Sequence, residues 1–198
     1  MRLNAAVVLA GIACLAVVPA HPAEEGRLPS GWFRAGSHPQ DYEMGTDPKG
    51  SRTGKPCAFI RGRGASPAGF GTLMQMFDAQ EYVGKRLRLT ASVKAEGITS
   101  WAGLWMRVDG ATVPGTQMPK MLAFDNMQSR PIKGTSDWTP YSIVLDVPVE
   151  ARAIGFGILL HGAGRAWMDD LRLEVVGVDV PLTDAMVLQK RPNLRFED

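Results

Sequence analysis

The feature of this sequence that most constrains its fold is a two-residue alternation of apolar and polar side chains between Lys85 and Ala95. Leu87, Leu89, Ala91 and Val93 alternate there with arginine, threonine, serine and lysine residues. Successive side chains of a β-strand point to opposite faces, so this pattern predicts a strand with one buried and one solvent-facing side. After residue 23 the sequence has no sustained apolar stripe at helical spacing, which an amphipathic helix would need.

The same alternation recurs in three other segments. Their apolar sets are Ala102, Leu104, Met106 and Val108; Tyr141, Ile143, Leu145 and Val147; and Ile154, Phe156, Ile158 and Leu160. Further strands are expected at Phe59 to Arg61, Phe70 to Phe77, Met121 to Asn126 and Arg165 to Val175, separated by turns rich in glycine, proline and aspartate. About eight short strands with such turns predict an all-β fold, an antiparallel two-sheet β-sandwich of the jelly-roll type.

The sandwich is expected to occupy residues 24–180. Its first part, residues 24–56, is rich in glycine, proline, serine and charged residues, so we expect it to be partly irregular, with short strands near Trp32 and Tyr42. Residues 181–198 contain few apolar side chains and are expected to form a C-terminal extension or linker.

Residues 1–23 have the pattern of a secretory signal peptide. A positive charge at Arg2 precedes an apolar run from Ala5 to Val18, and small residues follow at Ala20 and Ala23. A membrane anchor is the alternative, but the run is shorter than the ~20 apolar residues that span a bilayer. The sequence therefore predicts a periplasmic or secreted protein whose mature chain has no integral membrane segment.

Removal of residues 1–23 would leave 21 basic side chains (22 less Arg2), 20 acidic side chains and a single cysteine, Cys57. A single cysteine cannot form an internal disulfide, and burial on a strand is its common fate. Nearly balanced charge argues against non-specific binding to nucleic acid, and no helix-turn-helix pattern is present. We therefore expect no nucleic-acid partner.

The run from Trp138 to Val176 resembles the galactose-binding-like jelly rolls of carbohydrate-binding modules. It contains an aromatic-started strand, the "I-x-F-G" strand "IGFG", a glycine-rich turn, and a last strand with the aromatic-x-D-D-apolar signature "WMDDL". The stretches "YVGKRLRLTASVKAEGITSWAGLWMRVDG" and "LAFDNMQSRPIKGTSDW" also look like an accessory domain that accompanies secreted bacterial serine peptidases and hydrolases. Both resemblances imply a jelly roll, which hosts many functions.

Many of these modules begin with an "N-x-x-F-E" stretch, whose Glu holds a structural calcium together with an Asp of the last strand. The start "EEGRLPSGWF" lacks that stretch, and a similar string stands instead at Asn193 to Asp198. No cofactor is predicted, and a structural calcium is left open. Asp169 and Asp170 interrupt the alternation of the last strand, which predicts a β-bulge or, alternatively, a metal ligand set that lacks an identified third oxygen donor.

A candidate binding surface lies on the strand that contains Trp101 and Trp105. Its apolar face begins at Ala102, so both tryptophans share the opposite face with Gly103, Arg107 and Asp109. An indole ring can stack on the apolar face of a sugar while charged groups bond the hydroxyls. Alternatively, the N-terminal segment covers this face, and the tryptophans form a second small core.

Three further residues complete the predicted ligand-binding set. Asp125 and Asn126 suit hydroxyl recognition, but such residues also fix turns. His161 ends the strand on which Gly155 and Gly157 would let a ligand or a packed loop approach the backbone, although a lone strand-end histidine is more often structural.

The sequence contains no catalytic motif of the G-x-S-x-G or H-E-x-x-H type, so no catalytic residue is assigned. The predicted function is an exported, non-catalytic binding module of the carbohydrate-binding kind, with a saccharide or an exported protein as partner. The alternatives are an accessory domain that docks to an exported hydrolase, and a small glycan-active enzyme in which Asp109 and Asp125 flank the glycosidic bond.

Overall fold

The computed structural model describes residues 26–183, and its longest element is the 27-residue strand β5 (Arg86–Thr112). The predicted signal peptide and most of the predicted C-terminal extension lie outside the described residues. The other strands are β1 (Trp32–Gly36), β2 (Tyr42–Asp47), β3 (Cys57–Gly62), β4 (Phe70–Asp78), β6 (Pro119–Asp125), β7 (Ile132–Asp146), β8 (Ala153–His161) and β9 (Arg165–Val176). Two 3-10 turns, η1 (Pro39–Asp41) and η2 (Gln80–Tyr82), complete the described chain, which has no α-helix between residues 26 and 183.

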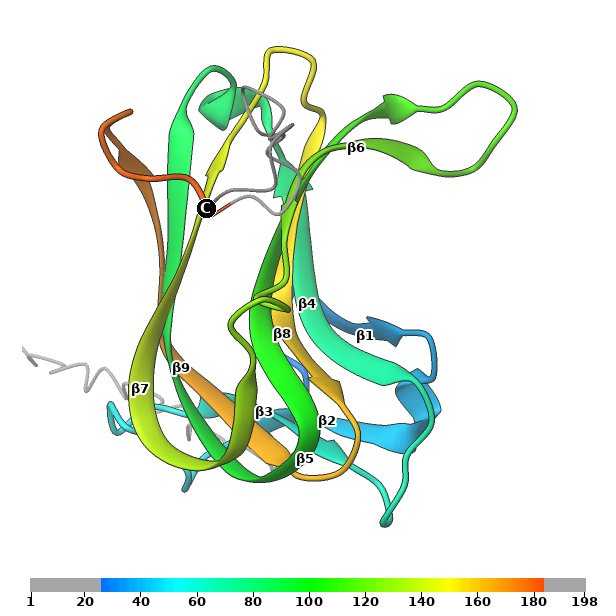
Figure 1. Ribbon diagram of the computed structural model, residues 1–198, viewed down its shortest axis with the longest axis vertical. Coiled ribbons are helices and arrows are strands. Elements are labelled where there is room, and N and C mark those ends of the chain that lie inside the picture. Colours follow the sequence, from blue (N-terminus) through cyan, green and yellow to red (C-terminus); the bar gives the residue numbers. More distant parts are fainter. Residues whose placement is uncertain (1–25, 184–198) are drawn as a thin grey trace, which may run out of the picture.

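The strands form one continuous nine-stranded sheet, and β5 runs through both of its layers. Residues 86–96 of β5 pair with β9, and residues 86–102 pair with β7. Residues 101–109 pair with β8, and residues 106–112 pair with β6. We call the layer with the order β7–β5–β9–β3–β2 sheet I and the layer with the order β6–β5–β8–β4–β1 sheet II; all the pairings are antiparallel. Figure 1 shows β7 and β9 on one side of the molecule and β8, β4 and β1 on the other. The predicted all-β antiparallel jelly roll is confirmed.

The sequence predicts two strands where the structure has the single strand β5. Between the two predicted segments the backbone bends instead of ending the strand: Gly97 has a φ of 59°, and the pairing with β7 shifts register between Ala95 and Ala102. A glycine adopts positive φ without steric cost, so the bend is accommodated within a continuous ladder. The alternation itself is as predicted.

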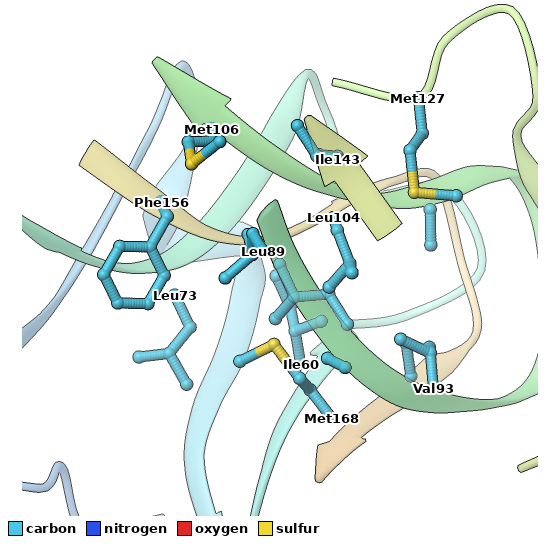
Figure 2. Close-up of a cluster of buried hydrophobic side chains, with 14 of the residues drawn as sticks. Ile60, Leu73, Leu89, Val93, Leu104, Met106, Met127, Ile143, Phe156 and Met168 are labelled. Atoms are coloured by element: carbon cyan, nitrogen blue, oxygen red, sulfur yellow. The ribbon is translucent and has the colours of Figure 1, made fainter. Parts of the chain in front are cut away.

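The apolar side chains of the two sheets meet between them and form the main core (Figure 2). Leu87, Leu89 and Val93 of sheet I are fully buried, as are Leu104 and Met106 of sheet II. Each such side chain contributes roughly 1.5–3 kcal/mol relative to an exposed one, so this layer is the main stabilising contribution. The core consists of the residues that the alternation points inward, which leaves the outward positions of both sheets for other roles.

The predicted bulge in β9 is confirmed. Ser92 pairs with Asp169 and Thr90 with Arg172, so two residues of β9 stand opposite Ala91 alone, and Asp170 has a φ of 52°. This irregularity explains the change in alternation along β9.

The N-terminal segment contains the expected short strands, β1 and β2, and Cys57 is buried as predicted. Burial raises the pKa of the Cys57 thiol to about 11, with the Asp47 carboxylate adding to the effect, so the thiol stays protonated and unreactive at neutral pH. Near the other end of the described chain, Thr183 donates its N–H to the Val144 carbonyl oxygen of β7. Within residues 26–183, no helix has the length and apolar character to cross a bilayer.

Candidate functional site: a groove on the outer face of sheet II

The outer face of sheet II carries the side chains that the alternation of β5 points away from the core. Trp101, Trp105 and Arg107 stand opposite His161, Gly157 and Gly155 of β8. The next strand, β4, places Phe70, Met74 and Met76 opposite these three β8 residues, and Thr72 opposite Leu159. Phe33 and Ala35 of β1 stand opposite Met74 and Thr72. The predicted shared face of Trp101, Trp105 and Arg107 is thus present in the structure.

This face is hollowed into a groove of about 540 Å³. Most of its lining is apolar or aromatic. The lining residues are Phe33, Ala35 and Gly36 of β1; Phe70, Thr72, Met74 and Met76 of β4; Trp101, Trp105 and Arg107 of β5; Phe124 of β6; Asn126; and Leu159 of β8. The volume lies within the range of known small-molecule sites.

The floor of the groove is the buried cluster of Trp105, Met74 and Leu159. The indole Nε1–H of Trp105 donates to Thr72 Oγ1 at 2.7 Å, and the Thr72 hydroxyl donates to the Ile158 carbonyl oxygen at 2.9 Å. These two bonds satisfy the polar edge of the ring and fix its orientation. Trp105 is therefore a rigid floor.

The glycines on this face make room for protein groups. A Cβ at Gly155 would lie 3.4 Å from the Trp105 ring and from Met76, so a tryptophan side chain is what approaches that backbone. A Cβ at Gly103 would lie 2.8 Å from the Asn126 carbonyl oxygen, so the chain after β6 crosses there. At Gly157, the other glycine that the sequence singled out, a Cβ would lie 2.2 Å from the Leu73 carbonyl oxygen of β4. The close approach predicted at Gly155 and Gly157 is therefore present, and a tryptophan side chain and the neighbouring strand provide it.

The N-terminal segment forms a wall of the groove. Phe33 of β1 and Met76 of β4 are each 40% exposed on one side, and Phe124 and half-buried Trp101 stand toward the other. The groove remains open beside both tryptophans. The alternative interpretation is correct in one part, because Trp105 belongs to a second small buried cluster, against which Trp101 of β5 and Ala35 of β1 pack. Its other part is wrong: β1 pairs at the edge of sheet II instead of crossing it, so residues 24–56 do not seal the face.

Arg107 and Asn126 are the polar lining residues that have hydrogen-bonding capacity to spare. Nε and Nη2 of Arg107 donate to Asp109 Oδ2 at 3.0 and 2.9 Å, and the Asp109 side chain is 2% exposed. Asn126 Oδ1 accepts the Gln128 backbone N–H at 3.1 Å, which leaves its amide NH₂ available. Both residues present N–H donors to the groove.

Asp125 and His161 do not line the groove. The buried Asp125 carboxylate accepts bonds from Arg130 at 2.6 and 3.2 Å and from the Met127 N–H at 2.8 Å, so it fixes the turn after β6. His161 is exposed beside Phe70 and Trp101, and its Nδ1 lies 3.1 Å from Ser100 Oγ. Asp109 also lies outside the lining, so the carboxylate pair considered for glycoside cleavage does not flank this groove.

The groove also contains aromatic and methionine residues of β1, β4 and β6 that the sequence did not reveal as site residues. In β4 the outward set includes Phe70, Met74 and Met76, and the inward set includes Leu73 and Phe77. Both sets are apolar, so alternation alone could not reveal which one faces the groove. An excess of apolar residues on both sides of a single strand was the available signal.

The residues of β9 that the family pattern assigns to calcium do not fit that ion. Both Asp169 oxygens already accept bonds, from the backbone N–H groups of Arg52 and Thr53 and from the Thr53 hydroxyl. Burial raises the pKa of this carboxyl, but the donated bonds outweigh it and the pKa is lowered. Between residues 26 and 183, no group of three or more histidine, cysteine, aspartate or glutamate side chains could hold a metal ion.

No protein-family model matches this sequence. A curated relative, the uncharacterized HTH-type transcriptional regulator YbfP of Bacillus subtilis (strain 168), is 42% identical over 173 residues. The match includes 85% of this chain and 57% of the relative, so the chain spans less than two thirds of the relative's length.

Solved structures of carbohydrate-binding modules share the fold. The CBM22-1 xylan-binding domain of Paenibacillus barcinonensis Xyn10C aligns with 75% of this chain and 88% of its own (TM-score 0.51, 12% identity). A family 30 carbohydrate-binding module aligns with 73% of this chain and 92% of its own (TM-score 0.51, 14% identity). The enzymatically active domain of bacteriophage CBA120 tailspike protein 4 aligns with 74% of this chain and 20% of its own (TM-score 0.51, 13% identity). The chain therefore has the jelly-roll fold of carbohydrate-binding modules over most of its length.

Proposed function

We propose that this protein is a non-catalytic binding module that holds a saccharide in the groove of sheet II. The observation that carries the proposal is the groove itself, with Trp105 as its floor and aromatic side chains in its walls. Flat aromatic surface suits the apolar face of a pyranose ring, and Arg107 and Asn126 supply donors for its oxygens. The shared fold with xylan-binding and other carbohydrate-binding domains supports this proposal.

The test is isothermal titration of the purified protein with a panel of soluble polysaccharides, for the wild type and for a Phe33→Ala/Trp101→Ala double variant. These two residues lie in the walls and make no side-chain hydrogen bond that the fold needs, so the variant should fold normally. We expect saccharide binding by the wild type and a loss of about 100-fold or more in the variant, because stacking surface on both walls is removed. Trp138→Ala, a change on the outer face of sheet I, is the control and should bind normally. No binding to any member of the panel would contradict the proposal.

The proposal includes export. The charged start, the apolar run and the small residues before position 24 support a cleaved signal peptide and a periplasmic or secreted location. Fractionation of the native host, with N-terminal sequencing of the mature protein, tests this part. An N-terminus after Ala20 or Ala23 is the expected result, and an uncleaved cytoplasmic protein would contradict it.

A second candidate is a ligand-sensing role related to the name of the B. subtilis relative, which is called a transcriptional regulator. Residues 26–183 have no α-helix to read a DNA groove, so the part of such a protein that they could supply is the effector-binding part. In this role the groove would bind a free small sugar as well as a polymer. Equal affinity for a monosaccharide and its polymer would favour sensing, and a requirement for several linked sugars would favour attachment to a polysaccharide.

The third candidate is docking to an exported hydrolase, which the resemblance to peptidase accessory domains suggests. The apolar lining is compatible with a protein segment as well as with a sugar. A pull-down from periplasmic extract separates the two, because soluble saccharide should release a sugar-bound complex and should not displace a protein partner.

A further inference from the structure

The hydrogen-bonding groups that the groove leaves open are mostly donors. Thr72 is buried, and its hydroxyl already accepts from Trp105 and donates to Ile158. Asn126 Oδ1 already accepts the Gln128 N–H. The lining side chains therefore offer more donors than acceptors, because the Trp101 indole N–H, the Asn126 NH₂ and the Arg107 N–H groups that do not bond Asp109 have no partner among the described residues.

The groove also carries little net charge. Arg107 is the one charged residue in the described lining, and its guanidinium is paired with Asp109 through two hydrogen bonds. The other Asp109 oxygen, Oδ1, is buried without a partner in the described chain and is out of reach of a ligand. A neutralised arginine suits a neutral acceptor oxygen better than a carboxylate, because an anionic ligand would face both members of the pair.

The donors sit beside apolar side chains. Arg107 pairs with Phe124 across β5 and β6, Asn126 follows two residues later, and Met76 lies across Gly155 on the other side of Arg107. Free sugar hydroxyls pressed against this surface would find few acceptors for their O–H groups, so the loss of water would be costly. A carbonyl oxygen with a methyl group would use the donors and bury the methyl against the Phe124 ring, which lies next to Arg107.

We propose that the groove selects saccharides that carry acyl substituents, either O-acetyl esters or N-acetyl amides. The carbonyl oxygen of the substituent accepts from Asn126 Nδ2 and Arg107, and its methyl group packs against Phe124. This inference rests on the proposed saccharide-binding function and specifies its ligand class.

Two matched ligand pairs test the inference by isothermal titration. The first is O-acetylated glucomannan against the same preparation after mild alkaline de-esterification, and the second is tetra-N-acetylchitotetraose against cellotetraose, which has a hydroxyl in place of each acetamido group. We expect the acylated member of at least one pair to bind about tenfold or more tightly, as one additional hydrogen bond with methyl burial provides. The pair that shows the preference identifies the ester or the amide as the source.

The matched variant is Asn126→Asp, which keeps an oxygen for the Gln128 N–H and replaces the NH₂ donors with an acceptor. We expect its preference for acylated ligands to fall to about threefold or less, while Gln128→Glu, the same chemical change outside the lining, leaves it intact. Equal or tighter binding of the unacylated members by the wild type overturns the inference and leaves saccharide binding standing. Binding to neither member of either pair overturns the inference, and the titrations with the polysaccharide panel then decide whether the saccharide-binding proposal stands.

Discussion

Two tryptophans on the outer faces of the two sheets are almost equally buried but have different surroundings. Trp105 of sheet II is 6% exposed, and Trp167 of sheet I is 7% exposed. Each indole N–H has a partner: Thr72 Oγ1 at 2.7 Å for Trp105, and Asp47 Oδ2 at 2.9 Å for Trp167. Trp105 is the floor of an open groove, whereas Trp167 is enclosed by a loop. Burial alone therefore does not distinguish a side chain that lines a groove from one that a loop covers.

The connection between β2 and β3 closes the outer face of sheet I. Gly50 of this connection lies against the Trp167 ring, since a Cβ there would be 2.7 Å from Nε1. The guanidinium of Arg165 stacks between Phe59 and Trp167, 4.5 and 4.4 Å from their ring centroids. Asp47 accepts bonds from both Arg165 and Trp167. The arginine and the carboxylate that could have served a ligand are used within the protein.

The largest effect that we expect comes from removing the Asp47 carboxylate from the closed face, the outer face of sheet I that the β2–β3 connection covers. Asp47→Ala leaves Arg165 without its carboxylate and the Trp167 N–H without an acceptor, so it should reduce the free energy of unfolding by about 3 kcal/mol. For a chain of this size, the thermal midpoint should fall by about 6–12 °C. Scanning calorimetry measures it, with the exposed Glu150→Ala as a control that should change little. Saccharide binding should survive at a temperature where the variant is folded.

Phenylalanine in place of each tryptophan should separate the two faces. Trp167→Phe should cost about 2 kcal/mol of stability and leave affinity unchanged, because its bond to Asp47 is lost under the loop. Trp105→Phe should weaken saccharide binding by about tenfold or more, because it shrinks the floor of the groove. Calorimetric unfolding and titration on both variants give the comparison. If the two variants lose affinity equally, the distinction between an open and a closed face is wrong.

A methyl group added to one glycine on each face should have a smaller effect. Gly50→Ala places Cβ 2.6 Å from Asp47 Oδ2 and 2.7 Å from Trp167 Nε1, so the loop must shift at a cost of about 1–2 kcal/mol. Gly155→Ala places Cβ 3.4 Å from its nearest neighbours, an ordinary contact, and should change stability by about 0.5 kcal/mol or less. Denaturant unfolding curves for the two variants would show the difference, and equal costs would contradict it.

Acid should reduce the stability that Asp47 provides on the outer face of sheet I. Burial raises the pKa of Asp47, but bonds from Trp167, Lys49 and Gly50 and the charge of Arg165 outweigh it, and the pKa is lowered below its ordinary value of 3.8. The unfolded chain then binds the proton more readily, so the stabilisation is complete above about pH 4 and is lost as the pH falls through the native pKa. Thermal midpoints between pH 6 and 2.5 test this. Asp47→Asn should flatten the dependence, whereas an unchanged slope would assign it to other groups such as Asp169.

Much of the sandwich could be predicted from the sequence, because strand alternation records which side chains face the core. The four alternating segments lie in β5, β7 and β8 as expected, and Trp101, Trp105 and Arg107 share the outward face. The sequence did not reveal that two predicted strands form the single strand β5, because the bend at Gly97 depends on pairing with distant strands. Local patterns do not record such pairing.

The candidate site was predicted in part for the same reason. Alternation along β5 placed one side of the groove, but Phe33, Met76 and Phe124 enter it from strands that are distant in the sequence. Asp125 was grouped with the tryptophans by its residue type, and it instead bonds Arg130 within the turn after β6. Whether a loop covers a face also depends on tertiary packing, so no local pattern distinguished Trp105 from Trp167.

The double membership of β5 has a consequence for how the chain folds. Half of β5 lies in the interior of each sheet, with a neighbouring strand on both sides. Neither sheet can therefore be completed before the other has begun to form. The β5 pairings join residues as distant as Arg86 and Val176, and such long-range closures are slow because chain entropy is lost before contacts form. We expect the two sheets to unfold in a single cooperative transition, with β5 amides among the slowest to exchange hydrogen for deuterium.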